Sequence, residues 1–266
     1  MTMTAGCDTH MHVYDGSYPA APTATLHPPD ASLEDYAHIQ AVIGTERVVV
    51  VQPTTYGLDN SLHLAALAEL GEAARGVMVI NSSTDNSELR RLTDLGVRGA
   101  RFHLLPGGAV DRSELEPIAA RIAPFGWHIQ LQLDGHELVD EVDRLRRLPC
   151  GLVIDHVGRF MPATPPDSSA FAALLALVDD GAHVKLSAPY ESSPDPTHRY
   201  ETVTACVDAL VARAPDRLLW ASNWPHPGQA DPPDVEDLIR LRRRWLSTEV
   251  LTRQVLIDNP ATLYNF

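Results

Sequence analysis

Short apolar runs alternate with longer amphipathic stretches along the whole sequence. Eight of the apolar runs are rich in β-branched residues and predict strands, at 6–14, 47–53, 75–81, 97–104, 127–133, 151–156, 183–188 and 217–224. Several runs, such as "RVVVV" at 47–51, are apolar at nearly every position. This pattern is typical of parallel strands that are buried on both faces of a sheet.

The stretches between these runs carry helix signals. Periodic segments at 32–44, 60–74, 86–96 and 111–126 predict helices, and several of them begin with Asp, Asn or Ser and end at Gly, as helix caps do. A doubly wound open sheet would normally show a GxGxxG turn after the first strand, where this sequence has "THMHVYDG". Eight strand–helix repeats in 266 residues therefore predict one (β/α)8 TIM barrel, a single domain over residues 1–266.

Charge and composition narrow the class of partner. The net charge of −14 argues against nonspecific binding to nucleic acid or to an anionic membrane, but it does not forbid an anionic substrate. No apolar stretch reaches the ~20 residues that cross a bilayer, and "MTMTAGCDTH" lacks the features of a secretory signal. Three cysteines without a CxxC spacing, Cys7, Cys150 and Cys206, suit a reducing compartment. We therefore expect a cytoplasmic protein. The sequence does not indicate the oligomeric state.

Polar side chains gather at the ends of the predicted strands, where a barrel places its active site. Unpaired polar groups in an apolar barrel cost ~1–3 kcal/mol each, so this number of them predicts a shared polar pocket. They are His10, His12, Gln52, Arg101, His103, Gln130, Gln132, Asp155, His156, Lys185, Ser187, Asn223 and His226.

Each of these residues also has a purely structural interpretation. A lone histidine on a strand is more often a hydrogen-bonded structural residue, but His10 and His12 share one face and aim at one point, as a metal ion or a polar substrate requires. Arg101 is costly to bury unless it meets an anion, whereas Lys185 could simply pair with a neighbouring carboxylate. The remaining histidines fall in predicted helices or loops, and we expect a surface position for His27, His38, His63, His136 and His198.

The motifs "DTHMH" at the first strand, "DHVGR" after the sixth and "NWPHP" after the eighth resemble the amidohydrolase superfamily. Within it, the chain is most similar to the branch of 2-pyrone-4,6-dicarboxylate lactonase and galactarolactone isomerase. The similarity continues through "GVRGARF", "WHIQLQL" and "DNPATLY", and "GARFHLLPGGAVDRSELE" and "YESS" favour the isomerase side of the branch. The resemblance implies a TIM-barrel enzyme that acts on a carboxylated lactone.

Most of the superfamily has an aspartate at the end of strand 8 that binds metal and activates water, and this sequence has Asn223 there. An amide does not accept a proton at a useful pH, which suits an isomerase that moves an aldaric lactone from the 1,5 to the 1,4 ring without hydrolysis. A tethered nucleophile gains high effective molarity and has less need of a strong base.

The resemblance implies roles for the remaining residues. His10, His12 and His156 surround the lactone carbonyl with Asn223, and the substrate carboxylate is gripped by Arg101 with Arg159 as a second clamp. Contacts to the hydroxyl groups are expected from Gln52, Asn60, Gln130, Tyr190 and His226.

Two questions stay open at this stage. The branch implies catalysis without metal, but His10, His12 and His156 could form a three-histidine site for a divalent ion such as zinc. A lactone hydrolase that uses a histidine base is the alternative activity. A catalytically silent barrel that binds a sugar acid is a second alternative, which the density of histidines disfavours.

Overall fold

Eight parallel strands form one sheet in chain order, β1 to β8, in the computed structural model, which describes residues 6–193, 195, 197 and 199–266. The strands are β1 (Cys7–Met11), β2 (Arg47–Val51), β3 (Ala74–Met78), β4 (Val97–His103), β5 (His128–Gln132), β6 (Gly151–Ile154), β7 (His183–Leu186) and β8 (Leu218–Trp220). The sheet closes through Met11 and Trp224, which form a parallel bridge, and through the bond from the Asn223 amide to the His10 carbonyl. The predicted TIM barrel is confirmed.

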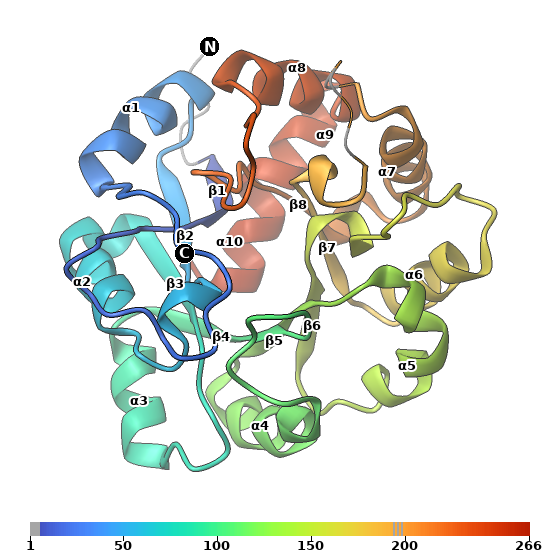
Figure 1. The fold of residues 1–266 in the computed structure, drawn as a ribbon. Coiled ribbons are helices and arrows are strands. Elements are labelled where there is room, and N and C mark those ends of the chain that lie inside the picture. Colours follow the sequence, from blue (N-terminus) through green and yellow to red (C-terminus); the bar gives the residue numbers. More distant parts are fainter. Residues whose placement is uncertain (1–5, 194, 196, 198) are drawn as a thin grey trace.

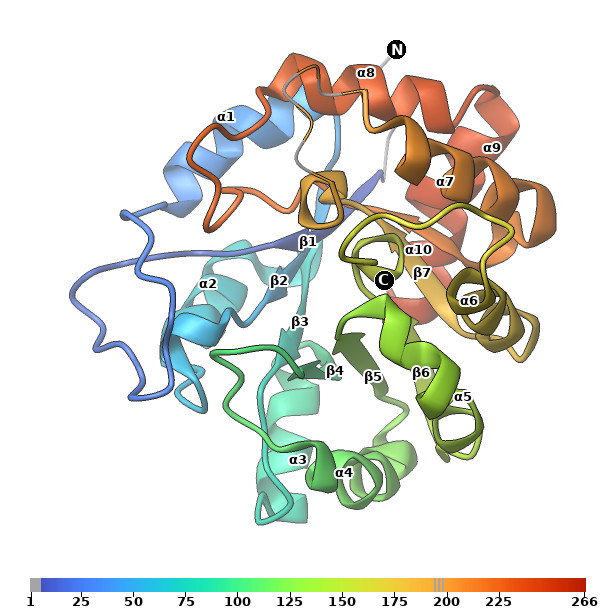
Figure 2. The ribbon, with the colours of Figure 1, turned by 45° about the vertical axis from the view of Figure 1, so that its right-hand side comes forward.

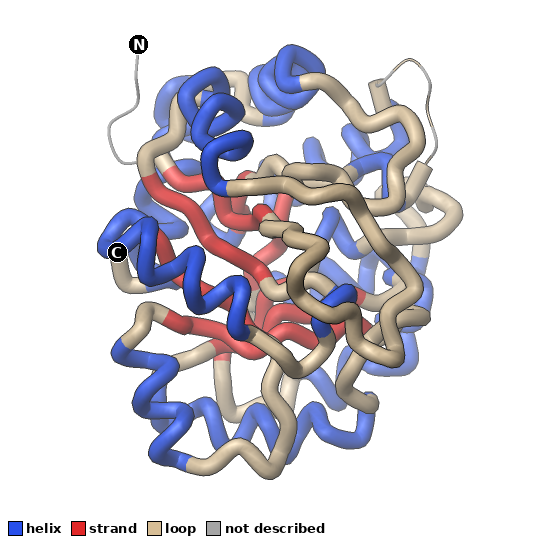
Figure 3. Tube along the Cα trace, turned by 60° about the vertical axis from the view of Figure 1, so that its left-hand side comes forward, coloured by secondary structure: helices blue, strands red, loops and turns tan. Residues whose placement is uncertain are grey.

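Helices surround the strands on the outside (Figures 1 and 3). They are α1 (Leu33–Ile43), α2 (Ser61–Leu70), α3 (Asn86–Asp94), α4 (Leu115–Ile122), α5 (Leu138–Leu145), α6 (Ser169–Asp179), α7 (Glu201–Arg213), α8 (Val235–Trp245), α9 (Glu249–Arg253) and α10 (Asn259–Tyr264). α1 and α8 lie side by side, which closes the outer ring (Figure 2).

The helix ends follow from local sequence. Ser32 caps α1 in a capping box with Asp35, and Gly44 ends the helix in the left-handed conformation that glycine adopts without strain. Asp85, Ser168 and Asp234 cap α3, α6 and α8 through their side chains. No helix in the described part of the chain is long and apolar enough to cross a membrane.

Two apolar layers hold the barrel together. The larger lies between strands and helices, and the smaller fills the barrel interior. The interior cluster consists of Cys7, Val49, Val51, Val77, Val153, Leu219 and Tyr264. Tyr264 belongs to α10, which Figure 1 shows behind the ring of strands. The carboxyl ends of the strands are left to polar side chains.

Candidate active site

Polar residues from six strands or the loops after them converge at the carboxyl end of the barrel. Each is at most 7% exposed, so they form a buried polar centre rather than a surface patch. They are His10, His12, Arg101, Gln130, Asp155, His156, Lys185, Asn223 and His226. Because the eight strands are parallel and lie in chain order, their carboxyl ends meet at one end of the barrel, and these residues lie together there as predicted.

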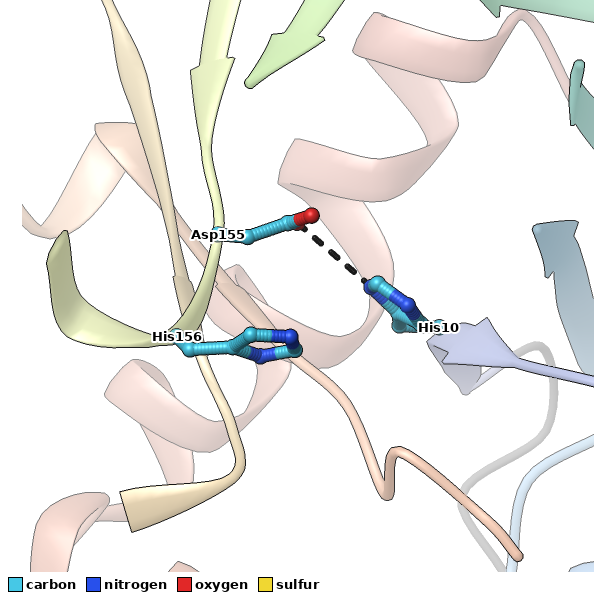
Figure 4. A group of neighbouring side chains, drawn as sticks. All are labelled: His10, Asp155 and His156. Atoms are coloured by element: carbon cyan, nitrogen blue, oxygen red, sulfur yellow. Dashed lines mark ion pairs between the residues drawn. The ribbon is translucent and has the colours of Figure 1, made fainter. Parts of the chain in front are cut away.

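His10 and His12 form a directed hydrogen-bonded pair on β1 and just beyond it. The Nδ1 of His12 lies 2.7 Å from the Val51 carbonyl oxygen, which only accepts, so His12 carries its proton on Nδ1. The Nε2 atoms of the two rings are 3.2 Å apart, and His10 must then donate from Nε2 to His12. His10 Nδ1 faces both Lys185 Nζ, 3.4 Å away, and Asp155 Oδ1, also 3.4 Å away (Figure 4), and burial together with the charge of Lys185 holds the pKa of His10 well below its usual value.

Lys185, Gln130 and Asp155 lie against His10. The Lys185 ammonium group donates to Gln130 Oε1 at 2.6 Å and to the Thr9 carbonyl at 2.7 Å, and its Nζ lies 3.4 Å from His10 Nδ1. Gln130 in turn donates to Asp155 Oδ2 at 3.1 Å. Gln130 therefore binds other side chains of the site in this structure, and it was expected to contact substrate.

His156 is the second residue of the loop after β6 and presents its ring to His10, with 5.1 Å between the ring centroids (Figure 4). Its Nδ1 shares a hydrogen bond of 2.9 Å with Ser187 Oγ. Burial lowers the pKa of His156, so its ring is neutral and able to accept a proton. Within the described residues, its Nε2 has no hydrogen-bond partner among the protein's side chains.

The loops after β6, β7 and β8 contain non-glycine residues with positive φ. These are His156 (54°), Val157 (54°), Arg159 (47°), Ala188 (43°), Tyr200 (49°), Asn223 (59°) and His226 (63°). Residues with side chains adopt this region only at an energetic cost, and such strain tends to be kept at functional sites. The clustering therefore supports this end of the barrel as the active site.

Arg101 is a buried guanidinium group held by neutral partners. It donates to the Gln52 carbonyl at 2.6 Å and to Gln132 Oε1 at 2.9 Å. In the described part of the chain, its Nε has no partner and no carboxylate lies within salt-bridge distance. Gln52 also has an unpaired buried oxygen, Oε1, and both residues line a small pocket with His103. A bound anion would satisfy both the charge and the free donor of Arg101.

Arg159 differs from Arg101 because its charge is already matched. Its Nε donates to Glu191 Oε2 at 3.0 Å, and both side chains are partly exposed. The two arginines expected to clamp the substrate therefore provide one uncompensated positive charge between them.

Asn223, Tyr190 and His226 form a second directed chain at the end of β8. Asn223 Nδ2 donates to the Tyr190 hydroxyl at 2.8 Å, so the hydroxyl donates in turn to His226 Nδ1, 2.9 Å away. The Oδ1 atom of Asn223 is buried without a partner in the described residues. The amide thus offers an acceptor oxygen to a ligand hydroxyl group.

Asn60, at the end of the loop after β2, is bound to the backbone of Val79. Its side chain donates to the Val79 carbonyl at 2.8 Å and accepts from the Val79 amide at 3.0 Å, which fixes the end of the loop after β2 to the chain beyond β3. Asn60 therefore supports the loop, and the substrate contact expected of it stays a prediction.

The sequence did not indicate the structural roles of two buried residues, Asp8 and His63. Asp8 accepts hydrogen bonds from the Ser222 amide at 2.9 Å, from the Ser222 hydroxyl and from Tyr36, and so ties β1 to the loop after β8. His63 was expected at the surface, but it is fully buried on α2 and its Nε2 accepts from the Val13 amide at 3.4 Å. His198 lies outside the described residues.

Comparison with known proteins identifies the family. Residues 7–266 match the family described as amidohydrolase. The chain belongs to the amidohydrolase family. It is 37% identical to D-galactarolactone isomerase from Agrobacterium fabrum, over 97% of this chain and 90% of that one. It is 34% identical to a 2-pyrone-4,6-dicarboxylate hydrolase from Comamonas testosteroni, over 97% and 89%. The superfamily and branch expected from the motifs are confirmed.

The fold of this amidohydrolase is also that of a solved relative. An apo crystal structure from Agrobacterium tumefaciens superposes with a TM-score of 0.93 at 36% identity, covering 99% of this chain and 97% of that one. The similarity therefore extends over the whole barrel, including the loops that carry the site.

A metal ion has one candidate group of ligands among the described residues. One donor atom each from His10, Asp155 and His156 lies within 4.8 Å of the others (Figure 4), so Asp155 takes the place expected for His12. His12 is directed instead toward Val51 and His10. The group fits a divalent cation poorly, because the Lys185 ammonium already lies 3.4 Å from His10 Nδ1 and 3.9 Å from Asp155 Oδ1.

Proposed function

We propose that this amidohydrolase isomerises an aldaric acid lactone from the 1,5 to the 1,4 ring by intramolecular acyl transfer. The observation that carries the proposal is Asn223, a neutral amide at the end of β8 with an unpaired acceptor oxygen. The relative named D-galactarolactone isomerase supports an aldaric lactone as the substrate class.

The carboxylates near the site support chemistry without activated water. In the described part of the chain, Asp8 is held by Ser222 and Tyr36, Asp155 lies between Gln130 and Lys185, and Glu191 pairs with Arg159. The Oδ1 atom of Asp155 has no hydrogen-bond partner in the described residues, but it lies 3.9 Å from Lys185 Nζ and 3.4 Å from His10 Nδ1, so the neighbouring cation stabilises its charged form and weakens it as a base. A tethered hydroxyl group is then the better nucleophile, because its effective molarity is high.

The proposed reaction balances without water or a metal ion. The substrate's 4-hydroxyl oxygen bonds to the lactone carbonyl carbon, the bond from that carbon to the 5-oxygen breaks, and the proton of the 4-hydroxyl ends on the 5-oxygen. His156 would carry this proton, since its ring is neutral and its Nε2 has no partner among the described residues. Asn223 and His226 would bind the substrate's hydroxyl groups. The Nε2 proton of His10, which His12 accepts in this structure, would turn to the lactone carbonyl and polarise it.

The missing counter-charge of Arg101 supports the proposal that the substrate carries one free carboxylate. A lactone made from a diacid keeps one carboxylate, and the site has one buried arginine that lacks a counter-charge in the described residues. A dicarboxylate such as the substrate in the hydrolase relative's name would call for a second cation, and Arg159 is already paired with Glu191.

Mass spectrometry in ¹⁸O-labelled water, combined with proton NMR that distinguishes the 1,5-lactone from the 1,4-lactone, tests the proposal. Incubation with aldaric 1,5-lactones should give a product of unchanged mass and without label. A product heavier by one labelled water would make the protein a lactone hydrolase, and lactones returned unchanged would favour a binding protein.

A further inference from the structure

Lys185 is the only lysine in the sequence, and the other 20 of the 21 basic residues are arginine. Its side chain is fully buried on β7, inside the barrel. Wherever else this chain needs a positive charge it has arginine, so the choice of an ammonium group here calls for a physical reason.

The contacts of Lys185 provide that reason. Its Nζ lies within 2.7 Å of two acceptors, Thr9 O and Gln130 Oε1, and within 3.9 Å of His10 Nδ1 and Asp155 Oδ1. A compact ammonium group can point its protons at several converging acceptors, whereas a planar guanidinium group needs more room and a flat arrangement of partners. Four groups converge on Lys185 much as ligands converge on a cation.

Two of these four groups belong to the candidate metal ligands, His10 and Asp155. A divalent ion bound by them would lie close to a like charge in a buried region, where screening by water is weak. It would also need the His10 Nδ1 lone pair or the Asp155 oxygen that the ammonium group faces. Lys185 and a metal ion therefore compete for the same donors.

We propose that Lys185 is the resident cation of this site, which compensates Asp155 and prevents a divalent metal ion from binding to His10, Asp155 and His156. If His10, Asp155 and His156 were not arranged to hold a metal ion, removal of Lys185 would leave zinc affinity unchanged. A lysine that excludes metal leaves behind a site that binds it. The two cases differ in zinc affinity, and this measurement needs no substrate, so the outcome is independent of the proposed isomerase activity.

The test is zinc affinity of the full chain without an affinity tag, measured by competition with a chromophoric chelator at pH 7.5. The variants are Lys185→Met, which keeps the length of the side chain without its charge, and the double variant Lys185→Met with Asp155→Asn. We expect Lys185→Met to bind one zinc ion at least 100-fold more tightly than the unaltered protein, and zinc to raise its melting temperature. The double variant should lose most of this gain, which separates the site from zinc bound by surface histidines.

Two results would overturn the proposal. One is submicromolar zinc binding by the unaltered protein that Asp155→Asn abolishes, and the other is a Lys185→Met variant whose affinity stays within threefold of the unaltered protein. If Lys185→Met does not fold, Lys185→Gln replaces it in the same comparison. The unaltered protein also offers a direct measurement, because ¹⁵N-lysine labelling gives a single Nζ signal. That signal should not change with one equivalent of zinc, and a change would contradict the proposal.

Discussion

Arg101 shows how a single side chain can define a substrate. Its guanidinium group is 5% exposed and bound only by neutral oxygens in the described residues, an arrangement that is costly until an anion arrives. Arg159, on the loop after β6, has Glu191 as its partner and carries no such cost.

Replacing Arg101 with Met should lower kcat/KM by about 100-fold or more, because removing one partner of a buried, charged hydrogen-bonded pair costs ~2–5 kcal/mol. Steady-state kinetics on an aldaric lactone measure the change, and a melting curve checks that the fold persists. The matched control is Arg159→Met, for which we expect a loss below about tenfold. Activity of Arg101→Met within a few-fold of the unaltered enzyme would rule out the carboxylate clamp.

Asn223 is the residue that separates isomerisation from hydrolysis in this account. Asn223→Asp should introduce a carboxylate that accepts a proton from water, so part of the lactone should be converted to the open diacid with ¹⁸O from labelled water. Asn223→Ala, the control, removes the hydrogen bond to Tyr190 without adding a base, and should slow isomerisation without causing hydrolysis. If Asn223→Asp yields only unlabelled lactone, the lack of a base at position 223 is not the reason that the enzyme isomerises rather than hydrolyses its substrate.

At the scale of elements, the joint between β1 and the loop after β8 depends on Asp8. This buried carboxylate accepts from the Ser222 amide and hydroxyl groups and from Tyr36 of α1, so it connects both ends of the barrel sheet to its outer ring. The joint also sets the position of His10 relative to Asn223, whose amide donates to the His10 carbonyl.

Asp8→Ala should lower the free energy of unfolding by about 2–5 kcal/mol, because it leaves buried donors on Ser222 and Tyr36 without an acceptor. Urea unfolding followed by circular dichroism measures the loss. Asp8→Asn keeps the shape and one acceptor oxygen, and should give a smaller loss. An unchanged unfolding midpoint in Asp8→Ala would show that the carboxylate does not hold the joint.

The barrel and most of its polar centre could be predicted from sequence because both depend on periodicity. Apolar runs such as "RVVVV" mark the strands. Side chains two apart on a strand share a face, and parallel strands end on the same side of the barrel, so His10, Arg101 and Gln130 could be placed together. The predicted strands ran too long, as in 217–224 against Leu218–Trp220, since beyond β8 the Ser222 amide donates to the Asp8 side chain and the Asn223 amide to the His10 carbonyl.

Other features depend on how loops pack, which no periodicity encodes. Asn60 binds Val79 because the loop after β2 approaches the chain beyond β3, and His63 is buried because α2 packs beside Val13. The exchange of His12 for Asp155 in the candidate metal group follows from the Val51 carbonyl, which fixes the direction of the His12 ring.

At the scale of the whole molecule, buried neutral histidines couple stability to pH. Burial lowers the pKa of His63, His103 and His128 to about 3, and that of His183 and His226 to about 4. An unfolded chain binds protons on these rings near pH 6.5, before the folded chain does. Their contribution to stability is therefore complete above about pH 6.5 and is lost as the pH falls toward 4 and then 3.

The urea midpoint should fall steadily as the pH is lowered from 7.5 to 5. His128 is the most informative of the five, because in the described residues neither of its ring nitrogens has a hydrogen-bond partner. His128→Leu should flatten this dependence without a loss at pH 7.5, and His27→Asn, at an exposed position, should leave it unchanged. A midpoint that does not vary between pH 7.5 and 5 would contradict this account of the buried rings.

The most direct measurement of the central claim is proton NMR of galactaro-1,5-lactone with the purified protein at neutral pH, with and without a chelator. We predict that the 1,4-lactone accumulates before any open diacid, because Asn223 favours the tethered hydroxyl over water. The rate should be the same in both samples, because Lys185 excludes a metal ion from the site. Direct formation of the diacid, with no 1,4-lactone preceding it, would contradict the account.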